Sequence, residues 1–211
     1  PGGAGPLARI GSLPAAGVAL YFSTVSPNSS TSPAIEVKGL WKSYRAGHLR
    51  PKYRPALEDL TFDVKQGEIF GFLGPNGAGK TTAIKVLLRL LSRERGEVRV
   101  LGLPHEDRSW RYRAGYLPEQ PYFYDYLSPR EYLDYVGALL AIPSGVRRER
   151  ASRLLVDVGL EPSADQPLRR FSKGMLQRLG LAQALLNEPD ILFLDEPMSG
   201  LDPLGRRQVR L

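Results

Sequence analysis

The chain has 211 residues, of which 42% are hydrophobic and 24% charged, with a formal net charge of +7 and no cysteine. This length supports one substantial core, while the apolar stretches are too short to cross a bilayer. The lack of cysteine excludes a disulfide framework and a thiolate metal site. The basic residues are scattered, which favours a solvated surface over a nucleic-acid or membrane patch.

Residues 1–34 differ from the rest of the chain in composition. They are rich in Pro, Gly, Ala, Ser and Thr and carry a single charge, at Arg9. Such a composition predicts a disordered or loosely packed tail. The run AAGVALYF has the apolar character of a signal peptide, but the basic start is weak and we reject that interpretation. We therefore expect the folded part to begin at Ile35.

From residue 35 onward, alternating or apolar runs predict strands. They lie at 35–44, 57–64, 68–73, 96–102, 114–120 and 190–194, the fifth ending in a loop. The runs EIFGFL (68–73) and DILFL (190–194) show little alternation, which is typical of strands buried on both faces of a parallel sheet.

Apolar residues at helical spacing predict four helices. The first carries Ile84 and Leu88, and the third covers about 146–158 and ends at Gly159. The second begins at Ser128-Pro129-Arg130-Glu131, which has the form of a capping box with proline at the first helical position. The fourth begins near Ser172.

The glycine-rich stretch between the strand at 68–73 and the first helix matches G-x-x-x-x-G-K-[ST] without a mismatch. Its glycines let backbone N–H groups converge on an anion, and the following helix adds its positive dipole end. We expect Lys80 to reach terminal phosphates, Thr81 to ligate Mg²⁺ and Thr82 to contact another phosphate oxygen. The predicted nucleoside triphosphate site comprises Gly74, Pro75, Asn76, Gly77, Ala78, Gly79, Lys80, Thr81 and Thr82.

Two acidic residues follow the apolar strand ILFL. Asp195 ends that strand, where its carboxylate can hold Mg²⁺ or a water bound to it. Glu196 comes next and can polarise the attacking water as a general base. The alternative for Glu196 is a surface acid at a strand end.

Several further motifs follow the glycine loop in a fixed order. They are Gln120 in LPEQP, RRFSKGMLQRLGLAQAL at 169–185 and SGLD at 199–202, while Tyr44 lies on the first predicted strand. Over residues 35–211 this order resembles the ATP-binding-cassette (ABC) ATPases. The resemblance implies that Tyr44 stacks on adenine, that Gln120 contacts Mg²⁺ and has a catalytic role, and that Asp202 lies in the D-loop beside the nucleotide.

The stretch FSKGM resembles the signature segment of that family. Ser172 is an expected helix N-cap, and the helix start exposes free N–H groups that form a second anion site. The resemblance implies that Ser172 and Gly174 of one chain touch the γ-phosphate held by a second cassette, in a head-to-tail homodimer. The alternative for Ser172 is an ordinary N-cap. Lys173 and Met175 depart from the usual signature, while Phe171 and the Ser-Lys-Gly-Met pattern resemble the bacterial export branch paired with ABC-2-type permeases.

The resemblance implies an α/β fold, with a P-loop NTPase (RecA-like) core, an antiparallel β subdomain and an inserted α-helical subdomain. We expect the core with the β subdomain at 35–118, the helical subdomain at 119–170, and the signature helix, Walker B strand and D-loop at 171–211. The family's switch histidine should follow the D-loop, but the histidines here, His48 and His105, lie upstream. We therefore expect a cassette that is incomplete at its C-terminus and poorly active alone.

The leading interpretation is an ATPase subunit that uses ATP and Mg²⁺ to power export through a separate polytopic membrane permease. It would lie peripherally on the cytoplasmic face of the membrane, with no nucleic acid as partner. The aromatic segment PYFYDYLSPREYLDYV is expected to supply mostly core residues, with exposed members among Tyr122–Tyr126 contacting the permease.

Two other assignments stay open from the sequence. The basic segment His48–Pro55 is interpreted as a solvated loop, with contact to the base or ribose as the alternative. The alternative function is an ABC ATPase that acts on nucleic acid or ribosomes, which the lack of a long coiled-coil insertion disfavours. A metabolic P-loop kinase has no use for FSKGM or SGLD.

Overall fold

The computed structural model describes residues 18–22, 32–46 and 52–197, and every structural statement below concerns these residues. The strands are β1 (Val18–Phe22), β2 (Ile35–Ala46), β3 (Lys52–Val64), β4 (Ile69–Phe72), β5 (Arg95–Val100), β6 (Leu103–Pro104), β7 (Ala114–Leu117) and β8 (Ile191–Leu194). The α-helices are α1 (Lys80–Leu87), α2 (Pro129–Leu139), α3 (Ser144–Asp157) and α4 (Lys173–Leu185). Short 3₁₀ helices cover Ser109–Arg113, Glu161–Ser163 and Leu168–Arg170.

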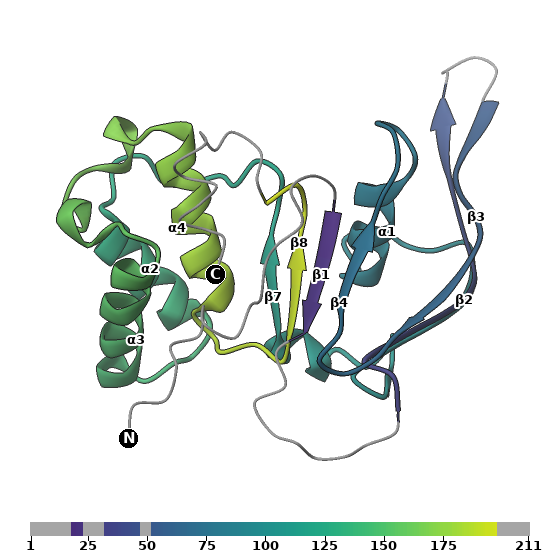
Figure 1. The fold of residues 1–211 in the computed structure, drawn as a ribbon, viewed down its shortest axis with the longest axis horizontal. Coiled ribbons are helices and arrows are strands. Elements are labelled where there is room, and N and C mark those ends of the chain that lie inside the picture. The colour runs from purple at the N-terminus through teal and green to yellow at the C-terminus, as the bar shows by residue number, and fades with distance from the viewer. Residues whose placement is uncertain (1–17, 23–31, 47–51, 198–211) are drawn as a thin grey trace.

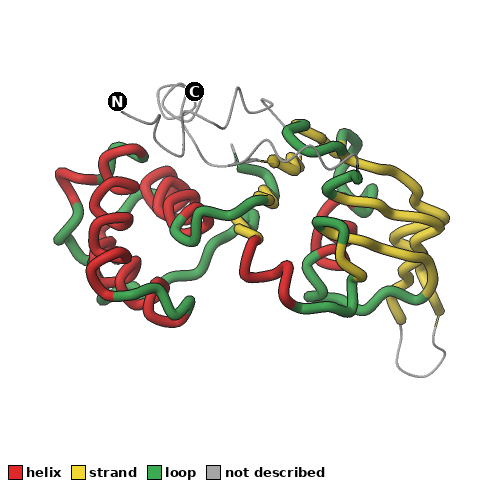
Figure 2. Tube along the Cα trace, turned by 90° about the horizontal axis from the view of Figure 1, so that it is seen from below, coloured by secondary structure: helices red, strands yellow, loops and turns green. Residues whose placement is uncertain are grey.

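The strands form two sheets with different roles. One sheet has the order β4-β1-β8-β7, and the other, fully antiparallel, has the order β3-β2-β5-β6. Helix α1 lies between the sheets, and α2, α3 and α4 cover the opposite side of the first sheet beyond β7 (Figure 1). Seen from below, those three helices gather at one end of the molecule and the long strands β2 and β3 at the other (Figure 2). The α/β class, the antiparallel subdomain and the helical layer agree with the expectation.

The position of β8 between two hydrophobic clusters explains why its sequence is wholly apolar. All four of its residues are buried, and alternate side chains enter two different hydrophobic clusters. Leu192 and Leu194 pack with the helical layer, whereas Ile191 and Phe193 pack with α1 and the antiparallel sheet. A strand covered on both faces cannot alternate with polar residues, so DILFL predicted its burial correctly.

Helix starts follow the local signals in the sequence. At α2, the Ser128 side chain accepts from the Glu131 N–H while Glu131 accepts from the Ser128 N–H at 2.8 Å, which completes the capping box. At α4, the Ser172 hydroxyl accepts from the Met175 N–H at 3.2 Å. Both side chains satisfy donors that the first helical turn leaves without a partner.

The expectation of a disordered tail at 1–34 is wrong for residues 18–22. That segment forms β1, which pairs antiparallel with both β4 and β8. The composition of the whole segment hid a five-residue run, VALYF, that contains β-branched and aromatic residues with a high preference for strands. Pairing on both sides satisfies the backbone groups that the edges of β4 and β8 would otherwise expose. Ala34 also belongs to the core, since it is buried and its N–H donates to Val64.

The prediction that EIFGFL is a buried strand is also wrong. Within the described sheet β4 has a single neighbour, β1, and its residues alternate between exposed and half-buried. Phe70 and Phe72 turn inward against Phe62, with ring centroids 5.1 and 5.2 Å from it, while Ile69 is exposed. One face of β4 packs against Phe62 and the other is exposed, and this one-sided cover produces the alternation.

Among the described helices, none combines the length and the apolar composition that a bilayer-spanning segment requires.

Candidate nucleotide-binding site

The glycine loop connects β4 to α1 and has the backbone shape that its sequence predicts. Gly77 and Gly79 adopt positive φ angles of 83° and 85°. A side chain at Gly79 would collide with the carbonyl oxygen of Ala56 on β3, so only glycine fits there. Helix α1 begins at Lys80 with no side-chain cap. Its first N–H groups are therefore available to an external acceptor.

Lys80 lies over this loop. Its ammonium group donates to the carbonyl oxygens of Gly74 and Pro75, at 2.8 and 3.0 Å. These contacts hold the charge at the mouth of the loop, where it can be shared with an anion. The arrangement concentrates one positive charge and a set of backbone donors at a single point.

Thr81 and Asp195 meet although 114 positions separate them in the sequence. The Thr81 hydroxyl donates to Asp195 Oδ1 at 3.1 Å. Asp195 follows β8 directly, is only 1% exposed, and its backbone N–H donates to the carbonyl of Leu117 at the end of β7. Burial raises the pKa of the Asp195 carboxyl, while the Thr81 hydrogen bond opposes that rise. The structure therefore joins the first turn of α1 to the carboxyl end of β8 through two oxygen-bearing side chains.

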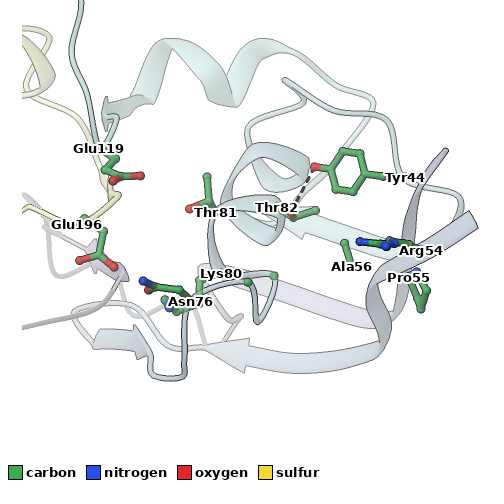
Figure 3. A pocket seen from close by; sticks show the side chains of 12 residues that line it. Tyr44, Arg54, Pro55, Ala56, Asn76, Lys80, Thr81, Thr82, Glu119 and Glu196 are labelled. Atoms are coloured by element: carbon green, nitrogen blue, oxygen red, sulfur yellow. Dashed lines mark hydrogen bonds between the residues drawn. The ribbon is translucent and has the colours of Figure 1, made fainter. Parts of the chain in front are cut away.

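A cavity of about 730 Å³ lies beside this contact, a volume typical of small-molecule sites. Its lining includes the predicted base, Glu196, and seven of the residues predicted to bind the nucleotide: Tyr44, Asn76, Gly77, Gly79, Lys80, Thr81 and Thr82. Four further residues line it: Arg54, Pro55, Ala56 and Glu119. Figure 3 shows Glu119 and Glu196 at one end, Tyr44 and Arg54 at the other, and the loop and α1 residues between them.

The acidic end combines residues that follow two neighbouring parallel strands. Glu119 lies two residues after β7 and Glu196 two residues after β8. Glu196 has a positive φ of 52°, a conformation that costs energy for a residue with a side chain and is concentrated at functional sites. Both carboxylates also raise the pKa of Asp195, after the larger effect of burial. This end of the cavity can orient water and oxygen-bound cations.

Oxygen ligands at this end suit magnesium. A hydroxyl and a carboxylate are hard donors of the kind that Mg²⁺ prefers, and Mg²⁺ usually keeps waters and phosphate oxygens as its other ligands. No group of three or more His, Cys, Asp or Glu residues in the described ranges is arranged to hold a metal alone. Thr81 and Asp195 thus fit a magnesium ion that arrives with a phosphate ligand, and do not form an independent metal cage.

The opposite end of the cavity comes from the β2–β3 hairpin. The Tyr44 hydroxyl shares a hydrogen bond of 3.2 Å with the Thr82 hydroxyl, which links β2 to the first turn of α1. Arg54 lies directly across the hairpin from Tyr44. The interpretation of His48–Pro55 as a solvated loop is wrong for Arg54 and Pro55, because β3 begins at Lys52 and places both along the cavity.

Other predicted site residues lie outside this cavity. Gln120 is exposed and does not line it; its neighbour Glu119 does. Ser172 and Gly174 lie at the start of α4 in the helical layer and do not line the cavity of the same chain. Asp202 falls outside the described residues. The catalytic and ligand-binding roles assigned to all of these residues stay predictions.

The glycine loop, the α1 start and the acidic residues after β8 define a P-loop nucleotide-binding protein. Comparison with known proteins narrows the class. Residues 57–199 match the ABC transporter family, and the chain belongs to that family.

Two relatives and one solved structure illustrate the similarity. An uncharacterized ABC transporter ATP-binding protein of Synechocystis sp. is 49% identical over 178 residues, which are 83% of this chain and 50% of the relative. The Nod factor export ATP-binding protein I of Ralstonia nicotianae is 35% identical over 195 residues, 90% of this chain and 57% of that protein. The chain thus spans about half the length of the curated relatives it matches.

The solved structure is a dimeric ATP-binding cassette in a post-hydrolysis state, bound to ADP and Pi. It superposes with a TM-score of 0.72 at 26% identity, and the match covers 83% of this chain and 79% of that one. The P-loop NTPase fold expected from the sequence is therefore confirmed.

Proposed function

We propose that this chain binds ATP with magnesium in the cavity between the β2–β3 hairpin and the ends of β7 and β8, and hydrolyses it to drive transport. Backbone N–H groups of the loop and the Lys80 ammonium hold the phosphates, because they supply convergent donors and positive charge. Thr81 and Asp195 hold the magnesium ion, which when bound neutralises charge on the phosphate oxygens. Glu196 accepts a proton from the water that attacks the terminal phosphate.

The single observation that carries the proposal is the 3.1 Å hydrogen bond from Thr81 to Asp195, because Thr81 and Glu196, the residue after Asp195, both line the cavity. It brings the three chemical parts of a phosphoryl-transfer site together: a phosphate cradle, an oxygen pair for magnesium and a base. Gln120 is exposed and does not line the cavity, so its contact to magnesium is proposed from the resemblance alone.

Replacing the base tests the proposal. We expect Glu196→Gln to retain ATP binding, since the phosphate cradle is untouched, and to abolish the slow phosphate release of the unsubstituted chain. Glu188→Gln is the matched control, because Glu188 pairs with Arg150 and Arg153 away from the cavity. Equal rates of phosphate release from Glu196→Gln and the unsubstituted chain would contradict the assignment of the base.

The proposal extends to a head-to-tail pair of cassettes. Ser172 is exposed at the start of the 13-residue helix α4, so its hydroxyl and the first-turn N–H groups can meet a phosphate held by a second chain. The dimeric cassette bound to ADP and Pi, which shares this fold, supports the arrangement.

Two substitutions at one position separate the anion site from the helix cap. Asp and Asn both cap helices as well as Ser does, so neither Ser172→Asp nor Ser172→Asn should lower stability. We expect Ser172→Asp to abolish ATP-dependent dimerisation in light scattering, because its carboxylate repels phosphate, while neutral Ser172→Asn still dimerises. If Ser172→Asp dimerised at the same ATP concentration as the unsubstituted chain, Ser172 would not lie at the interface.

The proposed partner of the pair is a membrane permease, with the protein held at the cytoplasmic face and transport directed outward. The named export function of the Ralstonia relative supports the direction.

Most aromatics of the segment 121–136 are exposed rather than in the core as expected, since Phe123 and Tyr132 alone among them are buried. Tyr122 is 89% exposed, and Tyr124 packs beside Tyr126 and Tyr135. Exposed tyrosines of this kind suit a protein contact.

A charge on this surface tests the permease contact. We expect Tyr122→Glu to abolish transport in the assembled system while ATP affinity stays unchanged, because Tyr122 lies outside the nucleotide cavity. Loss of ATP binding in this variant would contradict the separation of the two surfaces.

A further inference from the structure

The basic residue at the hairpin end of the cavity has a defined position. Arg54 on β3 pairs in register with Tyr44 on β2. Directly opposite residues of an antiparallel pair project from the same face of the sheet, and both line the cavity. Figure 3 shows the two side chains together, at the end away from Glu119 and Glu196. The next pair along the hairpin, Arg45 and Tyr53, projects from the opposite face.

The Arg54 guanidinium is available to a ligand. Arg54 is exposed, and its side chain makes no hydrogen bond or ion pair with any residue in the described ranges. Other arginines such as Arg113, Arg147 and Arg153 are each paired with a carboxylate. A guanidinium carries five N–H donors and no acceptor, so at this place it presents donors alone to the cavity.

The position of Arg54 along the cavity decides which part of a nucleotide it meets. The loop amides and Lys80 take the phosphates, and the Tyr44–Thr82 hydrogen bond marks the far side of the α1 start. Beyond that bond the cavity is lined by Tyr44, Arg54, Pro55 and Ala56. A nucleotide whose phosphates occupy the loop therefore places its nucleoside at this end, with the base against an aromatic ring and a guanidinium at its edge.

We propose that Arg54 is a nucleoside-binding residue that lets the site accept GTP as well as ATP. The inference rests on the proposed binding of a nucleoside triphosphate. The edge of guanine that carries N7 and O6 presents two acceptors, which match a guanidinium, whereas the same edge of adenine presents one acceptor and one donor. Arg54 contributes one hydrogen bond to an adenine nucleotide and two to a guanine nucleotide.

Binding measurements with three probes test this assignment on the 211-residue chain. Isothermal titration with ATP, GTP and inorganic tripolyphosphate, each with magnesium, separates nucleoside contacts from phosphate contacts. We expect Arg54→Ala to weaken ATP binding about threefold and GTP binding about tenfold, as expected for one and two partly exposed hydrogen bonds from a charged donor. Tripolyphosphate binding should stay unchanged, because that probe has no nucleoside.

Arg45→Ala is the matched control. It removes the same charge from the same hairpin but from the other face, so it should change none of the three affinities. Arg54 is exposed, so coincident thermal unfolding of both variants and the unsubstituted chain verifies the fold.

The outcomes are distinct. Unchanged ATP and GTP affinities in Arg54→Ala would overturn the inference. An equal loss for tripolyphosphate would also overturn it, by assigning Arg54 to the phosphates. If the unsubstituted chain bound none of the three probes, the proposed function itself would be refuted, and this inference with it.

Discussion

Asp195→Asn should raise the free energy of unfolding of the ligand-free protein and reduce the extra stability that bound ligand gives. Asp195 is 1% exposed, and burial raises the pKa of its carboxyl, so the folded state disfavours the charge it carries at neutral pH. Asparagine keeps an oxygen to accept from Thr81 and removes that charge. We expect the free energy of unfolding without ligand to rise by about 1 kcal/mol, the size typical of single buried substitutions.

When magnesium and ATP are present, the difference in stability between the two proteins should change sign, so that Asp195→Asn becomes the less stable one. A ligand at a hundred times its dissociation constant stabilises the unsubstituted protein by about 2.7 kcal/mol. If losing the carboxylate weakens binding about a hundredfold, the same ligand concentration stabilises Asp195→Asn by only about 0.4 kcal/mol. Urea denaturation followed by circular dichroism, with and without ligand, measures both quantities. Asp195→Asn should therefore be the more stable protein without ligand, and the unsubstituted protein the more stable one with ligand.

Asp190→Asn is the control for this crossing. Asp190 precedes β8 as Asp195 follows it, but it pairs with Arg113 near the surface, with 2.5 Å between Arg113 Nε and Asp190 Oδ2. Losing a partly exposed pair should cost about 0–1 kcal/mol and leave the stabilisation by ligand intact. Full stabilisation by ligand in Asp195→Asn would refute the role of Asp195 in holding magnesium. A large loss of stability without ligand would show that the carboxylate is needed by the fold.

Two further predictions concern stability away from the cavity. Gly115→Ala should lower the free energy of unfolding, measured by urea denaturation, by about 2–3 kcal/mol, because the new methyl group would collide with the Ala184 carbonyl between β7 and α4. Gly145→Ala is the contrasting variant in α3, where the space is open. It should raise the free energy of unfolding by about 0.5–1 kcal/mol. Stability should also fall as the pH drops below about 6.5, by at most about 1.4 kcal/mol per pH unit. Burial lowers the pKa of His105, which faces Arg93, Arg89, Glu106 and the Leu87 carbonyl, so the unfolded chain takes up this proton first. His105→Gln should flatten the slope measured between pH 7 and pH 5, and an unchanged slope would exclude His105 as its source.

Local signals predicted the elements whose structure is decided locally. The capping box at Ser128 and the cap at Ser172 are each complete within a few residues, so spacing alone located the starts of α2 and α4. The glycine loop is equally local, because its positive φ angles are properties of Gly77 and Gly79 themselves. The apolar run at β8 predicted burial because no polar face was left to expose.

Features that depend on pairing between distant segments could not be read in the same way. The place of β1 between β4 and β8 depends on which edges are open in the assembled sheet, and a composition average over 34 residues obscures so short a strand. Arg54 reaches the cavity because of the register of β2 with β3, which contains several irregularities. Arg54, Pro55 and Ala56 all line the cavity, and the register shifts between the Ser43–Pro55 and Lys42–Leu57 pairs, so simple alternation along β3 could not have predicted this lining.

Glu119 was missed for a different reason. The resemblance drew attention to Gln120, and the sequence does not say which of two adjacent loop residues turns toward a cavity. A general rule would have included both, since ligands in open α/β sheets bind beyond the carboxyl ends of the parallel strands. Glu119 lies beyond the end of β7, which runs parallel to β8, and so occupies that position.

The cavity is assembled from two parts of the molecule, one of which contributes to both hydrophobic clusters. Its acidic end follows β7 and β8, whose Leu117, Leu192 and Leu194 belong to the cluster of the helical layer and whose Ile191 and Phe193 belong to the other. Its aromatic and basic end comes from the β2–β3 hairpin, whose Leu40 and Leu57 belong to the other cluster. A nucleotide bound along the cavity would contact both ends at once. Binding energy would therefore be lost if either part unfolded alone, so the ligand should stabilise the whole chain and not only the loop that holds its phosphates.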